Sequence, residues 1–95
     1  MGETEEDLRR RLYYQAAHRG MKESDLLLGT FAKVHLPRFD ATQLAEFDRL
    51  LQLQDRDILY WRLGQEPLPP EHDGPVMRLL LAFTLVAGFS ISEKR

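Results

Sequence analysis

Apolar positions recur at helical spacing along most of the chain. Between residues 5 and 19, Leu8, Leu12 and Ala16 repeat every four positions, which predicts a helix and not a strand. Acidic residues at the start of this segment and basic residues at its end would complement the helix dipole. Gly20 follows and suits the left-handed backbone conformation that often closes a helix.

A second helix is predicted to begin at Ser24, as its N-cap, and to stop near Leu36, because Pro37 follows. Gly29 lies inside this helix, where glycine costs about 1 kcal/mol relative to alanine. We therefore expect another helix to cross closely at Gly29. The buried face would comprise Leu27, Leu28, Phe31 and Val34.

The third helix carries a capping-box pattern, with Asp40 as its N-cap and Gln43 three residues later. It should end around Leu53, and its apolar face would comprise Leu44, Phe47, Leu50 and Leu51.

A fourth, shorter helix is predicted with Asp55 as its N-cap and Asp57 in its first turn. It should bury Ile58 and part of Trp61 and stop at Gly64.

Residues 65–75 hold four of the five prolines and predict a loop, after which Pro75 would open a last helix. Residues 79–92 carry no charge, but this run is shorter than the roughly 20 apolar residues that span a bilayer, so no membrane insertion is expected. No segment shows the alternation of a strand. The predicted fold is an all-α, five-helix bundle, a single domain over 1–95 with flexible ends at about 1–4 and 92–95 and a proline-rich loop at 65–74.

Composition limits the function classes. The chain has 95 residues, of which 43% are hydrophobic and 29% charged, as expected for one small folded domain. A formal net charge of −2 argues against nucleic acid as a partner, and the lack of cysteine excludes disulfides and thiolate zinc sites. A domain of this size has little room for a substrate cavity of ~300–1,000 Å³, so surface recognition is the more natural function.

Titratable residues do not form a catalytic or metal-binding pattern. His18, His35 and His72 are far apart in the sequence and lack the spacing of a metalloprotease motif. The carboxylates at 5–7 and those of Asp55 and Asp57 fall at predicted helix starts, where acids interact with free amides. Catalytic and metal sites are therefore predicted to be absent.

The segment "HRGMKESD", residues 18–25, carries more charge than a short turn between helices requires. In the simpler interpretation, Gly20 closes a helix and Arg19 forms an exposed ion pair with Glu23, which would contribute about 0–1 kcal/mol. In the alternative, the glycine lets a partner's backbone approach between a guanidinium and a carboxylate, so the turn is a docking surface.

The part "RGMKESD" resembles the RGxxExD signature of the flavinylation factors of succinate dehydrogenase, the SdhE-like family, which is known in mitochondria as succinate dehydrogenase assembly factor 2. "LLQLQDRDILYW", residues 50–61, is similar to the second block of this family, and "GTFAKVHL" extends the likeness. The resemblance covers about residues 8–90. Gln52 and Gln54 stand where relatives often have acids, and the last helix is more apolar than in the family.

The resemblance implies an assembly chaperone and not an enzyme with its own turnover. Members help to attach FAD covalently to a histidine of the flavoprotein subunit of succinate dehydrogenase, and in bacteria also of fumarate reductase. The histidine nitrogen would join a methyl carbon of the flavin ring, while the factor holds the subunit so that the two groups meet. FAD would belong to the partner, and no cofactor would be bound stably by this chain.

The resemblance implies which residues of this sequence correspond to the functional residues of the family. The docking surface would comprise Arg19, Gly20 and Glu23, with Asp25 shaping the turn and Met21 and Lys22 at its rim. Asp57 and Trp61 match the second block and are assigned mainly to structure.

The alternative to a flavinylation factor is a generic helical interaction module, such as a regulatory subunit, in which the turn serves only structure. A hydrolase or metal enzyme ranks third. The acidic start "MGETEED" lacks an apolar signal segment and favours the bacterial cytoplasm, or the mitochondrial matrix for a processed eukaryotic form. Direct contact with FAD and the oligomeric state stay open.

Overall fold

The computed structural model describes residues 2–84, and this part of the chain contains helices and no strand. The expected all-α class with five helices is confirmed. Two short 3₁₀ turns, η1 and η2, accompany the helices. The elements are α1 (Glu5–Ala17), α2 (Lys22–His35), η1 (Leu36–Arg38), α3 (Ala41–Leu50), α4 (Asp55–Arg62), η2 (Pro70–His72) and α5 (Pro75–Ala82).

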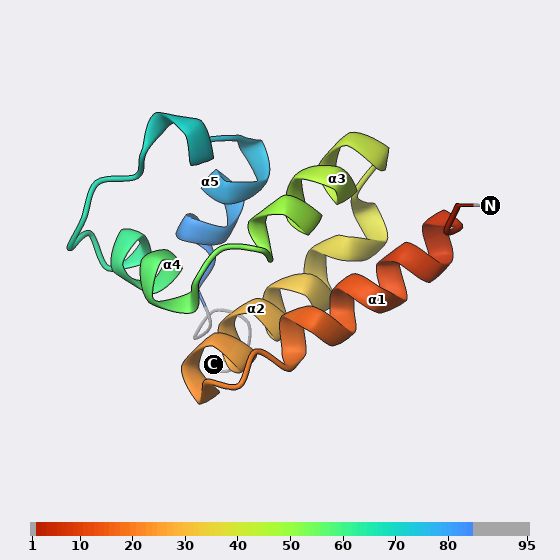
Figure 1. Cartoon of the computed structure of the whole chain (residues 1–95), viewed down its shortest axis with the longest axis horizontal. Coiled ribbons are helices and arrows are strands. Elements are labelled where there is room, and N and C mark those ends of the chain that lie inside the picture. Colours follow the sequence, from red (N-terminus) through yellow and green to blue (C-terminus); the bar gives the residue numbers. More distant parts are fainter. Residues whose placement is uncertain (1, 85–95) are drawn as a thin grey trace, which may run out of the picture.

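An antiparallel hairpin of α1 and α2 forms the long side of the molecule (Figure 1). Helix α3 packs against α1, and α5 packs against both α3 and α4. These contacts enclose one apolar core, to which every α-helix contributes. Its largest fully buried side chains are Phe31, Phe47, Leu12, Leu28, Leu44, Ile58, Met77 and Leu80.

The close crossing expected at Gly29 is confirmed. A Cβ atom built on Gly29 would lie 3.2 Å from both Cα and Cβ of Ala17, so the two helices of the hairpin meet backbone to backbone here. Glycine at this position lets the end of α1 pack closely against the middle of α2.

A Gly29→Leu variant should lower the free energy of unfolding by about 1–3 kcal/mol, because the added side chain overpacks the contact with Ala17. Lys33→Leu, one turn later on an exposed position of the same helix, should change it by less than about 0.5 kcal/mol. Urea denaturation followed by circular dichroism measures both. Equal stability of the two variants would contradict the close crossing.

Two expectations for α2 are wrong. The helix begins at Lys22 with Met21 as its N-cap, and Ser24 is 2% exposed, with its hydroxyl 3.6 Å from the Met21 sulfur. Ser24 lies in the first turn, on the side that faces the core, so it cannot cap the helix. Val34 is 43% exposed, because the buried stripe runs through Ala32 instead.

The capping box of α3 is confirmed. The Asp40 carboxylate accepts a hydrogen bond from the Gln43 amide, and the Gln43 side chain accepts one from the Asp40 amide, each at 2.9 Å. Helix α4 differs from expectation, because Gln54 occupies the N-cap position without a side-chain bond and Asp55 is the first helical residue. Helix α4 ends at Arg62, and Gly64 follows it with a φ of 75°.

A long-range contact caps α5. Pro75 opens this helix as expected, and the Glu46 carboxylate of α3 accepts hydrogen bonds from the amides of Val76 and Met77, at 3.0 and 3.1 Å. Helix α5 ends at Ala82 and Phe83 has an extended backbone, so the helix predicted to continue to residue 92 is interrupted here. Residues 85–92 of that prediction lie outside the described residues. No helix in the described part of the chain has the length and apolar character needed to cross a membrane.

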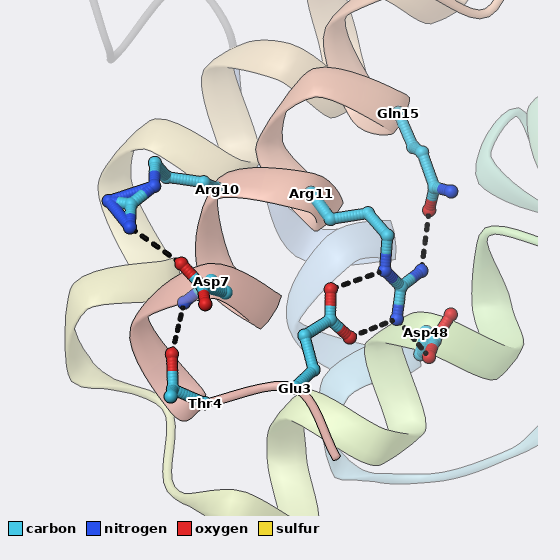
Figure 2. Close-up of polar contacts among 7 residues, drawn as sticks. All are labelled: Glu3, Thr4, Asp7, Arg10, Arg11, Gln15 and Asp48. Atoms are coloured by element: carbon cyan, nitrogen blue, oxygen red, sulfur yellow. Dashed lines mark hydrogen bonds and ion pairs between the residues drawn. The ribbon is translucent and has the colours of Figure 1, made fainter. Parts of the chain in front are cut away.

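Arginines of α1 tie this helix to its neighbours. Arg9 donates to the carbonyls of Leu36 and Phe39, at 3.0 and 2.7 Å. Figure 2 shows that the guanidinium of Arg11 donates to both carboxylate oxygens of Glu3. One of its terminal nitrogens also donates to the carboxylate of Asp48 in α3, at 3.2 Å. Helix α1 is therefore fixed along its length before it reaches the turn that precedes α2.

His35 lies in an aromatic cluster at the other end of α2. Its ring centroid is 4.5 Å from that of Phe31 and 5.8 Å from that of Phe39. Burial lowers the pKa of His35 below its usual value of 6.5, and the positive charge of Arg38 lowers this pKa further. The folded state therefore favours the neutral imidazole.

Stability should decrease as the pH falls below 6.5, because the unfolded chain then binds a proton at His35 before the folded chain does. The contribution of neutral His35 to stability is fully present above pH 6.5. It is lost as the pH falls from 6.5 to the lower pKa that His35 has in the folded state. Melting temperatures measured between pH 8 and pH 5 should fall less steeply for His35→Phe than for the natural sequence. Parallel curves would contradict this assignment.

Candidate functional site

Arg19 joins the turn after α1 to the connection between α3 and α4. Its Nε donates to Oδ1 of Asp55 at 2.7 Å, and its two terminal nitrogens donate to the carbonyls of Leu51 and Leu53, at 2.5 and 2.7 Å. Within residues 2–84, no backbone amide donates to either carbonyl. Arg19 thus satisfies acceptors that the end of α3 leaves free, and its charge is balanced by Asp55.

Asp25 holds the same turn from the other side. Its Oδ1 accepts hydrogen bonds from the backbone amides of Arg19, at 2.5 Å, and Gly20, at 3.1 Å. The backbone of Gly20 has a φ of 98°, a conformation that other residues rarely adopt. The carboxylate and the glycine together reverse the chain direction between the two helices.

Four residues of this turn are exposed, and we call Gly20, Met21, Lys22 and Glu23 the docking turn. Among the described residues, apart from its two chain neighbours, nothing lies within 4 Å of a Cβ atom built on Gly20, so this part of the chain leaves open space beside the glycine. Within the described part of the chain, the carboxylate of Glu23 and the ammonium of Lys22 form no ion pair. The docking turn therefore presents an accessible backbone beside two charged side chains.

The position of Arg19 differs from both interpretations of the sequence. Its side chain is 11% exposed, so it does not lie on the surface as expected, and it pairs with Asp55 and not with Glu23. The physical reason is the pair of free carbonyls at the end of α3, which attract the guanidinium inward. Partner binding by the docking turn, and any contribution of Arg19 and Asp25 to it, stays a prediction.

Asp57 and Trp61 of the second block lie on α4, and their assignment to structure stays a prediction. Trp61 packs partly buried against the core, with its ring centroid 5.4 Å from that of His72. Asp57 lies in the first turn of α4 and contacts Arg56 at 3.3 Å. The contact of Asp55 with Arg19 was not predicted from the sequence, because the local pattern indicated that Asp55 caps its own helix.

A shallow depression of about 480 Å³ lies beside Arg19. Its lining includes the stacked rings of Tyr14 and His18, whose centroids are 4.1 Å apart, and Leu53 and Asp55 from the α3–α4 connection and the start of α4. Nδ1 of His18 is 2.8 Å from the Tyr14 carbonyl oxygen, which fixes the ring on the helix end. Among residues 2–84, no group of three His, Asp or Glu side chains could hold a metal ion.

Comparisons with known proteins identify the family of this chain. A family model described as "Flavinator of succinate dehydrogenase" matches residues 10–84, which include both the docking turn and the second block. Succinate dehydrogenase assembly factor 2-B, mitochondrial, of Drosophila melanogaster is 48% identical over 77 residues, which are 79% of this chain and 49% of that protein. The Drosophila erecta protein of the same name is 49% identical over 74 residues, or 76% of this chain and 47% of the relative.

The chain spans about half the length of these curated relatives. Their names place them in mitochondria, so they do not support the expectation of a bacterial cytoplasm, and the compartment of this chain stays a prediction. The family match covers most of the chain and every described helix except the start of α1. The chain therefore belongs to the family of succinate dehydrogenase flavinators, a family of assembly factors.

Proposed function

We propose that this chain promotes the covalent attachment of FAD to the flavoprotein subunit of succinate dehydrogenase. It would bind the immature subunit through the docking turn and hold it so that the acceptor histidine lies against the flavin. The observation that supports this most strongly is the match of residues 10–84 to the flavinator family, which includes the docking turn.

The geometry of the docking turn supports a contact role. Gly20 has a positive φ and open space beside it, so a partner's backbone can approach closely. Because Arg19 and Asp25 fix the turn from two sides, little conformational entropy is lost when a partner binds. A fixed backbone with free charges on its rim fits recognition of a folded protein surface.

In this proposal the chain contributes position and the partner contributes the reacting groups. FAD and the acceptor histidine would belong to the flavoprotein subunit. A methyl carbon of the flavin ring would lose a proton and bond to a histidine nitrogen, which would lose its own proton. The two electrons released would reduce the same flavin ring, which an electron acceptor such as oxygen would then reoxidise. The factor would lower the barrier by restricting the orientation of the subunit around these two groups. It would act in the compartment in which the subunit matures, and fumarate reductase would be a second partner where it is present.

Co-expression tests the proposed function. The chain is produced with a succinate dehydrogenase flavoprotein subunit in cells that lack their own factor, and covalent flavin fluorescence is measured in a denaturing gel. Fluorescence should rise well above that of the subunit alone. Without such a rise, the chain would be a generic helical interaction module. A parallel culture with a fumarate reductase subunit shows whether this partner is also served.

Glu23→Ala should weaken binding to the flavoprotein subunit about tenfold, as expected for the loss of about 1.4 kcal/mol from one charged contact. Glu6→Ala is the matched control, because Glu6 is also an exposed acid in the first turn of a helix. Both variants should keep nearly the same melting temperature. Titration calorimetry with the purified subunit measures the affinities, and equal weakening by the two variants would remove Glu23 from the contact.

A further inference from the structure

We infer that Asp55 is a positioning residue for the docking turn, and this inference rests on the proposed function. Asp55 would act through Arg19 and would not touch the partner itself. The contact would connect the turn that carries the signature to the second block of this chain, although 31 residues, 24–54, lie between the docking turn and α4. Asp55 of the second block accepts a hydrogen bond from the guanidinium of Arg19, which belongs to the signature.

The contacts of Arg19 leave it little freedom. Each of its three guanidinium nitrogens donates a hydrogen bond, one to Asp55 and one to each of two carbonyls in the α3–α4 connection. Because the guanidinium is planar, three acceptors in fixed positions determine its orientation as well as its place. Asp55 is the only one of the three that carries a charge.

The position of Arg19 also affects the backbone of the docking turn. The amides of Arg19 and Gly20 both donate to the carboxylate of Asp25 in α2, so a shift at Arg19 would disturb both bonds. The turn is therefore bound to α2 by Asp25 and to the α3–α4 connection by Arg19 and Asp55. Loss of either connection would allow the exposed residues to sample other arrangements.

A simpler role for Asp55 is that of an acid near the start of α4, where it interacts with the helix dipole. Asp57 has this role too, since it lies in the same turn of α4, but it is 38% exposed and contacts Arg56 instead of Arg19. The side chain of Asp55 is 18% exposed and that of Arg19 is 11% exposed. A substitution of Asp57 therefore serves as a control for the effects of the helix dipole and of net charge.

Positioning and contact have different kinetic consequences. If Asp55 only keeps the docking turn in its binding conformation, its removal raises the concentration of factor needed for half-maximal flavin attachment. The maximal rate at saturation should not change, because the bound complex has the same geometry. Removal of a group that holds the partner's reacting centres in place would lower the maximal rate as well.

The test compares Asp55→Asn with Asp57→Asn in the full chain, using a purified flavoprotein subunit and FAD. Covalent flavin formation is measured against factor concentration, and hydrogen exchange of the Gly20 amide is measured on the free chain. Asp55→Asn should raise the half-maximal concentration about tenfold at unchanged maximal rate and speed Gly20 exchange about tenfold. Asp57→Asn should change each by less than about twofold, and Asp55→Glu, which keeps the charge, should restore part of the loss.

An unchanged half-maximal concentration for Asp55→Asn would overturn the inference, as would equal effects of the two asparagine variants. If Asp55→Asn fails to fold, Asp55→Glu supplies the comparison, and an effect of Asp55→Glu no larger than that of Asp57→Asn would also overturn it. If the natural sequence itself gives no flavin attachment, the proposed function fails. The exchange rates then still decide whether Asp55 fixes the turn.

Discussion

Gly20→Arg is expected to keep the helical fold and to lose nearly all promotion of covalent flavin attachment. The backbone of Gly20 has a φ of 98°, so any other residue here costs roughly 1–2 kcal/mol. Within the described part of the chain, apart from the two neighbouring residues, no atom lies within 4 Å of a Cβ at this position, so the Cβ of the new side chain meets no steric clash there. Under the proposed function, it would instead fill the space through which the flavoprotein subunit would approach.

Gly64→Arg is the matched control for this variant. Gly64 also has a positive φ, of 75°, and open space around its Cβ, but it follows α4 and lies outside the docking turn. The two variants should lose similar stability in thermal denaturation, while only Gly20→Arg loses flavin attachment in co-expression. An unfolded Gly20→Arg protein beside a folded Gly64→Arg protein would show that Gly20 serves the fold and not the docking.

Arg19→Ala should lower the free energy of unfolding by about 3 kcal/mol, because it removes one partner of a partly buried ion pair and leaves two carbonyls without a donor. The change leaves the Asp55 carboxylate and the carbonyls of Leu51 and Leu53 without their donor. Small domains have only about 5–15 kcal/mol in total, so the melting temperature should fall by roughly 12 °C or more. Arg19→Lys should be intermediate, because an ammonium lacks the planar fork that reaches all three acceptors.

Arg10→Ala provides the comparison for this large effect. Arg10 lies on the same helix as an exposed partner of Glu6 and Asp7, with a side chain that is 66% exposed. Its removal should cost less than about 1 kcal/mol. Denaturant unfolding of the three arginine variants measures the differences, and a loss below about 1 kcal/mol for Arg19→Ala would mean that the guanidinium is not a structural connection.

Most of the helical framework could be predicted from local patterns. The stripe of Leu12 and Ala16, the capping box of Asp40 and the glycine crossing at Gly29 all depend on residues that are close in sequence or on one helix face. The errors involve polar residues near helix starts. Ser24 and Asp55 both have the chemistry of an N-cap, and the sequence does not show that one faces the core and the other an arginine 36 residues away.

The same limit applies to contacts between distant elements. The sequence could not predict that Glu46 of α3 caps the start of α5, because this bond depends on how the two helices pack. For the candidate site, the sequence identified the segment around Gly20 but not which members are exposed. Arg19 points inward because it binds the carbonyls of Leu51 and Leu53. These carbonyls are available only because they lie in the connection between α3 and α4, which the local sequence pattern did not predict.

The rate of covalent flavin formation in a purified mixture tests the central claim most directly. A flavoprotein subunit without covalent flavin is incubated with FAD and increasing amounts of this chain, and bound flavin is measured after denaturation. The rate should rise to saturation with the natural sequence and with Gly64→Arg, and stay at the level of the subunit alone with Gly20→Arg. A rate that does not depend on the chain, or that rises equally with Gly20→Arg, would contradict the docking turn as the site of action.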